Sequence, residues 1–134
     1  EFLTPSFDEE ESLRELPALG VSAQSLHFLN YLIAEPLHAA AVYREGLLVR
    51  IPRPERFAVH KMIVADRRLD GPDSAKARKD LRQAELLVTV LAEDRPSDLQ
   101  EAYEDALQRG PKWRERLQRS IARSAAIGER LRQA

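Results

Sequence analysis

Cysteine is absent from this chain of 134 residues, and glycine and aromatic residues are scarce. The absence of cysteine excludes disulfide bonds, thiolate catalysis and cysteine-ligated zinc sites. The sequence contains neither a run of about 18 apolar residues nor a signal-peptide pattern, so we expect no membrane segment and a cytoplasmic location. What remains is a mixed composition, 43% hydrophobic and 32% charged, which is typical of one globular domain with a hydrophobic core.

The small net charge of −1 conceals an uneven distribution of charge along the chain. Residues 1–16 carry six acidic side chains and one basic one, residues 44–82 carry eleven basic and six acidic ones, and residues 112–134 carry seven basic and two acidic ones. The basic block in the middle favours a nucleotide or nucleic-acid ligand, because clustered cations attract phosphates. A solvated helix surface is the alternative explanation of the same block.

The pattern of apolar and chain-breaking residues predicts an α+β chain that is mostly helical. We expect a strand end at residues 2–4, a loop at 6–16, a helix at 22–34, and a hairpin whose strands are residues 37–43 and 47–51. A bundle of helices follows at residues 54–69, from residue 73 or 74 to about 91, 97–108 and 112–132. The predicted subdomains are residues 1–53 and 54–134, packed as one compact unit.

The most informative segment sets a cluster of cations and one carboxylate on two neighbouring predicted helices. Lys61 falls at the edge of the apolar face of the first helix, where its ammonium must either extend to water or meet an anion. On the second helix, Lys76, Lys79 and Asp80 share one face. Together with Arg68, these lysines would suit a polyphosphate. The alternative role of Asp80 is a surface ion pair with Lys76, worth about 0.3–0.5 kcal/mol.

The positions of the three histidines in the sequence predict neither a metal site nor a catalytic site. His27 and His38 lie on different predicted elements without ligand spacing, which argues against a histidine metal site. His60 has no nucleophile or paired carboxylate near it in the sequence, which favours a packing or hydrogen-bonding role over that of a general base.

Three segments of the chain resemble a known family: residues 1–5, residues 46–61, which end in Pro-Glu-Arg-Phe-Ala-Val-His-Lys, and residues 76–84, which begin Lys-Ala-Arg-Lys-Asp. They are similar to the C-terminal part of a bacterial nucleotidyltransferase-fold family, itself distantly similar to abortive-infection and toxin-type nucleotidyltransferases. The resemblance extends to about residue 118. It implies the remainder of a nucleotidyltransferase fold and the transfer of a nucleoside monophosphate from an NTP to a hydroxyl of an RNA, a protein or a small molecule.

The resemblance also implies roles for individual residues. Glu1 takes the place of a third carboxylate, as a catalytic residue and a Mg²⁺ ligand beside upstream carboxylates, although Glu1 and Phe2 can also be explained as a remnant of cloning. Asp80 takes a charged position of the last active-site motif and is the second candidate catalytic residue. The triphosphate would be neutralised by the basic residues Lys61, Arg68, Lys76 and Lys79.

The sequence lacks the Gly-Ser turn and the Asp-x-Asp pair with which such enzymes hold magnesium. It also begins at Glu1, and its single methionine is Met62, so we expect a piece of a longer protein that is inactive alone and pairs with its missing N-terminal half or with a second copy. The alternative is a catalytically inactive helical module. Its basic last helix, with Arg116, Arg119 and Arg123, would contact nucleic acid or an acidic partner protein.

Overall fold

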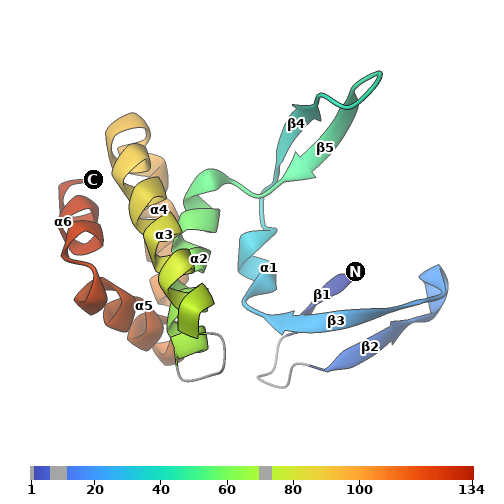
Figure 1. Cartoon of the computed structure of the whole chain (residues 1–134), viewed down its shortest axis with the longest axis horizontal. Coiled ribbons are helices and arrows are strands. Elements are labelled where there is room, and N and C mark those ends of the chain that lie inside the picture. Colours follow the sequence, from blue (N-terminus) through green and yellow to red (C-terminus); the bar gives the residue numbers. More distant parts are fainter. Residues whose placement is uncertain (1, 7–11, 70–73) are drawn as a thin grey trace. The chain divides into compact units, whose positions relative to one another are not determined.

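A computed structural model of the chain describes residues 2–6, 12–69 and 74–134. The chain divides into two units, Glu1–Pro52 and Arg53–Ala134. The first unit holds the strands and the second is built from helices (Figure 1). The predicted α+β class with mostly helical content is therefore confirmed. None of the described helices is both long and apolar enough to cross a membrane.

In the described part of the first unit, three short strands form one sheet, namely β1 (Leu3–Ser6), β2 (Leu13–Leu16) and β3 (Val21–His27). β3 lies in the middle, parallel to β1 and antiparallel to β2. Its Gln24 stands opposite Leu3 on one side and Leu13 on the other. A strand with partners on both edges satisfies its backbone donors and acceptors within the sheet.

The predicted helix over residues 22–34 is wrong. Residues 21–27 form β3, and only Leu29–Leu32 is helical, as α1. The apolar residues of this stretch fit a helical period, but Ala23 and Ser25 are both buried and alternate as the inward side chains of a strand do. Pairing with two other strands decides between the two patterns, and this pairing is not visible in the local sequence.

The other predictions for the first part of the sheet also need correction. β1 continues through Pro5 to Ser6, two residues beyond the predicted end. Proline is tolerated there because β1 is an edge strand of this sheet. The predicted loop over residues 6–16 is wrong at residues 13–16, which form β2, while residues 7–11 lie outside the described residues.

The predicted hairpin of the first unit is confirmed. β4 (Leu37–Ala41) and β5 (Leu47–Ile51) pair antiparallel, with Leu37 opposite Ile51. Between them Gly46 has a φ of 85°, a conformation that glycine adopts without steric cost. The turn signal in the sequence therefore marks the hairpin correctly.

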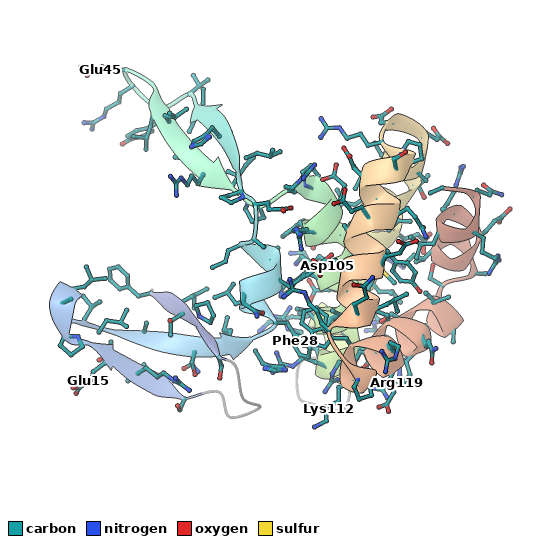
Figure 2. All side chains as sticks on the ribbon, turned by 180° about the vertical axis from the view of Figure 1, so that it is seen from behind. Glu15, Phe28, Glu45, Asp105, Lys112 and Arg119 are labelled. Carbon is teal, nitrogen blue, oxygen red and sulfur yellow. The ribbon has the colours of Figure 1, made fainter. Side chains whose placement is uncertain are left out.

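The described residues of the second unit form five helices, namely α2 (Pro54–Leu69), α3 (Ser74–Asp94), α4 (Pro96–Gln108), α5 (Pro111–Arg123) and α6 (Ala125–Gln133). α2 contacts α3, α4 and α5, and Figure 1 shows α2 and α3 side by side. The buried side chains of α2 belong to the core of this unit, and Figure 2 draws the side chains of the described residues as sticks on the ribbon. Fully buried members of this core include Met62, Val88, Leu99, Leu117 and Ile127.

The predicted single helix over residues 112–132 is wrong, because the chain turns at Ser124. The backbone of Ser124 is extended, with φ −135° and ψ 100°. Its hydroxyl accepts a hydrogen bond from the backbone N–H of Ile127 at 3.3 Å and donates one to Glu85 of α3 at 2.8 Å. Ser124 thus caps the start of α6, and the turn allows α6 to pack against α3.

Candidate functional site

Asp80 of α3 is the centre of a cluster of charged side chains, with only 4% of its own side chain exposed. Its Oδ1 accepts a hydrogen bond from Lys61 Nζ at 2.6 Å, and its Oδ2 accepts one from Arg68 Nη1. Lys61 and Arg68 both belong to α2 and lie seven residues, or two turns, apart on the same side. The three side chains, called the Asp80 cluster below, join α2 to α3.

The two cations of the Asp80 cluster remain partly exposed. Lys61 keeps 19% and Arg68 39% of its side-chain surface in solvent. A buried carboxylate without a cation would be strongly unfavourable, so Asp80 requires at least one of them. The sequence predicts that the Lys61 ammonium either extends to water or contacts an anion. The structure shows the second outcome, with Asp80 as the anion. The ammonium also lies 5.3 Å from the centre of the Phe57 ring, a favourable cation–π distance that further fixes its position.

His60, beside Lys61 in the sequence, is held neutral at physiological pH. Burial is the main cause that lowers the pKa of His60 from 6.5 to about 4. The positive charges of Lys61 and Arg67 act in the same direction, while the charge of Asp80 opposes them. A base with a pKa near 4 is a weak proton acceptor at pH 7. The structure therefore favours the packing or hydrogen-bonding role over a general base.

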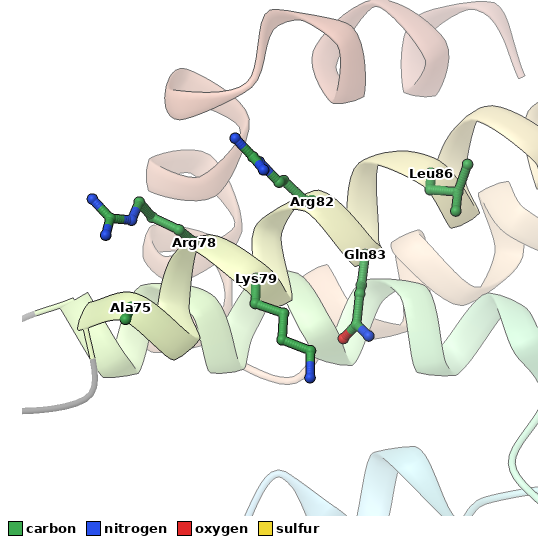
Figure 3. A pocket seen from close by; sticks show the side chains of 6 residues that line it. All are labelled: Ala75, Arg78, Lys79, Arg82, Gln83 and Leu86. Carbon is green, nitrogen blue, oxygen red and sulfur yellow. The ribbon is translucent and has the colours of Figure 1, made fainter.

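Lys76 and Lys79 both lie at exposed positions of α3. Lys79 precedes Asp80 directly and lines an open hollow along α3 together with Gln83. Figure 3 shows these two side chains on one side of α3, while Arg78 points away from them. The structure thus brings Lys61 and Arg68 together at Asp80. Lys76 and Lys79 lie on the outer surface of α3 instead. A phosphate-binding role stays a prediction for all four cations.

The predicted metal ligand and catalytic residue Glu1 lies outside the described residues. Among residues 2–6, 12–69 and 74–134, no three His, Asp or Glu side chains come together in a way that could hold a metal ion. Magnesium binding stays a prediction.

A second buried carboxylate, Asp66 of α2, was missed by the sequence analysis. Three arginines of α5 surround it: Arg119 donates two hydrogen bonds at 2.9 and 2.7 Å, Arg123 donates one at 2.7 Å and Arg116 one at 3.1 Å. Burial alone would raise the pKa of Asp66, but the hydrogen bonds and charges of Arg119 and Arg123 lower it below the ordinary value of 3.8.

Two sequence signals could have revealed this arrangement. Asp66 follows Met62 by four residues and therefore stands on the buried face of α2, where a carboxylate needs a cation. Arg116, Arg119 and Arg123 follow one another at spacings of three and four, which places them on one face of a helix. Only the structure shows that these two faces meet.

A third charged cluster connects α2 with α4. Arg56, whose side chain is 10% exposed, donates a hydrogen bond to Asp105 at 2.5 Å, and Arg109 donates two more. Burial would raise the pKa of Asp105, but the hydrogen bonds from Arg109 and Arg56 lower it. Each of the three helices that pack on α2 is thus linked to it through one carboxylate.

Comparison with known families gives a match over the strands and the helices α1 to α4. A family model with the description Nucleotidyltransferase matches residues 1–108, which include the Asp80 cluster and end with α4. Neither a curated protein nor a solved structure matches the chain. The bacterial origin and the toxin-type relatives implied by the resemblance stay predictions. Because the matched residues make up most of the sequence, the chain belongs to the nucleotidyltransferase family.

Proposed function

We propose that the chain serves the transfer of a nucleoside monophosphate from an NTP to an acceptor hydroxyl, and that the Asp80 cluster binds the triphosphate. Nucleotidyl transfer follows from the family. The observation that supports the position of the triphosphate is the arrangement at Asp80, where a buried carboxylate holds two cations whose outer surfaces remain in solvent. Such an arrangement offers fixed positive charge to a ligand.

The charges of the cluster suit this role. Lys61 and Arg68 carry two positive charges against the single negative charge of Asp80, so the cluster has a surplus of one positive charge. Lys79 adds another on the adjoining surface of α3. Cations that are fixed before the substrate arrives stabilise the charge of phosphoryl groups at little reorganisation cost. Asp80, buried behind these cations, acts in this proposal as a positioning residue.

The two cations of α2 would contribute in different ways. The guanidinium of Arg68 is planar and can donate two parallel hydrogen bonds to phosphate oxygens. The ammonium of Lys61 is a compact point charge, and its long side chain ordinarily loses rotational freedom on binding. Contact with Asp80 and with the ring of Phe57 restricts that freedom in advance. We infer that binding therefore costs less conformational entropy.

Magnesium belongs to the same proposal, as a second source of positive charge at the triphosphate. Its ligands would be Glu1 and the upstream carboxylates that the resemblance implies. The proposed roles of Lys61, Arg68 and Asp80 do not depend on how the metal is held.

The test is equilibrium binding of a fluorescent NTP, with and without magnesium, to the wild type and to Lys61→Gln. This substitution leaves Asp80 paired with Arg68, so the fold should be retained. Loss of one charged hydrogen bond of about 1.5–3 kcal/mol predicts at least a tenfold weaker affinity. Lys112→Gln, at an exposed position of α5, is the matched control and should bind like the wild type.

One more variant and the outcomes below decide how this experiment is interpreted. Lys61→Arg keeps the charge and should recover part of the affinity. Equal affinities of the wild type and Lys61→Gln would refute the proposed position of the triphosphate, as would an equal loss in Lys112→Gln. A wild-type chain that binds no NTP under any condition would favour the alternative of an inactive helical binding module.

A further inference from the structure

Five arginines of α3 and α5 form a continuous basic surface, called the arginine surface below. Its members are Arg78 and Arg82 of α3 and Arg116, Arg119 and Arg123 of α5. α5 lies beyond the residues that match the family, so the family assignment gives these α5 side chains no role.

The part contributed by α5 consists of three guanidiniums gathered at one carboxylate. A carboxylate can be satisfied by one bidentate guanidinium, yet Asp66 is surrounded by three. The side chains of Arg116, Arg119 and Arg123 are 28%, 49% and 38% exposed, so part of each guanidinium-bearing side chain remains accessible to a ligand. Because Asp66 holds the guanidiniums in place, they are ordered before any ligand binds.

The part contributed by α3 continues this surface. Arg78 lines the same small hollow as Arg123, between α2, α3 and α5. Arg82 follows Arg78 by one helical turn and points to the same side of α3, as Figure 3 shows. Both side chains are exposed, and neither forms an ion pair with another described residue.

The hollow between Arg78 and Arg123 is apolar inside. It has a volume of about 130 Å³, and its floor is formed by the side chains Ala65, Leu69, Ala77 and Leu81. An apolar recess bordered by guanidiniums suits a nucleobase, because arginine both stacks on bases and pairs with phosphates. A nucleic-acid strand carries both groups in every nucleotide, whereas an acidic peptide needs an aromatic residue at the right position to fill the recess.

We propose that the arginine surface binds a single-stranded nucleic acid, with its phosphates along α3 and α5 and one base at the hollow. Arginines spaced by one turn along two helices offer successive contacts to a chain of phosphates, whereas a single anion would use only one of them. This inference does not depend on the proposed NTP site, because strand binding is measured without nucleotide.

The experiment measures binding of a fluorescent 20-residue oligouridylate to the whole chain as a function of salt concentration. The test variant is Arg78→Gln/Arg82→Gln, since these exposed side chains are not needed to pair Asp66. For single strands, each lost phosphate contact reduces the salt slope by about 0.7, so two contacts predict a slope smaller by about 1.4 and an affinity weaker by about 25-fold at 0.1 M salt.

The matched control is Arg114→Gln/Arg130→Gln, which removes the same charge from the same unit. Arg114 donates to a backbone carbonyl of α4 and Arg130 pairs with Glu93, so neither belongs to the arginine surface. The control should keep the wild-type slope and lose less than about threefold in affinity. Thermal unfolding of each variant verifies that its fold is retained.

Three results would overturn the inference. The first is an unchanged slope and affinity in Arg78→Gln/Arg82→Gln. The second is an equal loss in the control, which would mean that only the overall charge matters. The third is displacement of the strand by an oligoglutamate peptide as effective as unlabelled oligouridylate, which would assign the surface to an acidic protein partner.

Discussion

Replacing Asp66 by asparagine removes a negative charge from a buried position and almost preserves the shape of the side chain. The wild-type carboxylate accepts four hydrogen bonds from three guanidiniums of α5. An asparagine keeps only one oxygen, and its NH₂ group faces donors instead of acceptors. Three like charges also lose their common counter-charge. We therefore expect Asp66→Asn to weaken the attachment of α5 to α2.

The size of the effect can be worked from these contacts. Breaking a buried ion pair ordinarily costs about 3–5 kcal/mol. The three arginines are between 28% and 49% exposed and can turn toward water, which favours the lower end, about 3 kcal/mol. With an unfolding entropy of about 2.1 cal/mol/K per residue and a chain of 134 residues, the melting temperature should fall by roughly 10 °C.

The assay is thermal unfolding followed by circular dichroism at pH 7, supported by urea unfolding at 25 °C. The matched control is Asp98→Asn, because Asp98 is 44% exposed and lies 3.8 Å from Arg53. Surface pairs of this kind contribute about 0–1 kcal/mol. A melting temperature of Asp66→Asn within about 3 °C of the wild type, or equal to that of Asp98→Asn, would refute the structural role of Asp66.

Three further predictions concern pH and the start of α6. The pKa of His60 is about 4 in the folded chain against 6.5 in the unfolded one, so its stabilisation is complete above pH 6.5 and is lost as the pH falls toward 4. Between pH 7 and pH 5 the wild type should lose about 2 kcal/mol of stability that His60→Gln does not lose, and parallel urea profiles of the two proteins would argue against this. The pKa of Asp66 is lowered, so the stability difference between the wild type and Asp66→Asn should persist above pH 3.8 and close as the pH falls through the folded-state pKa; a constant difference in acid would be inconsistent with it. Ser124→Ala removes the cap of α6 and should cost about 1 kcal/mol in urea unfolding, whereas no measurable loss would show that the cap is not needed.

The elements that the sequence predicts well are those specified by local signals. Pro54 sets the first turn of α2, and apolar residues at helical spacing continue to Leu69, so both ends of this helix agree with the prediction. The elements that it predicts poorly depend on distant partners. β3 exists because two other strands pair with it, and α5 ends because the backbone of Ser124 turns toward α3.

The residues of the candidate site also fall into those that local sequence signals predict and those that depend on distant partners. The position of Lys61 at the edge of an apolar face predicts that its ammonium needs water or an anion, and the structure supplies Asp80. The spacing along one helix cannot show that Arg68 reaches the same carboxylate from α2. Asp66 was missed because its partners are some fifty residues away, on a helix whose arginines were assigned to contacts with nucleic acid or a partner protein. Charge pairing across helices is a tertiary property, and periodicity within one helix does not reveal it.

The central claim is that Lys61 contacts the phosphates of a bound nucleotide, and a series of ligands that differ only in phosphate number tests it most directly. The affinities of the wild type and Lys61→Gln for the mono-, di- and triphosphate of one nucleoside would be measured under identical salt. We expect the wild-type affinity to rise with each phosphate and the gain from mono- to triphosphate to shrink about tenfold in Lys61→Gln, in line with the loss of one charged hydrogen bond. An equal gain in both proteins would contradict the claim, because it would show that Lys61 does not contact the phosphates.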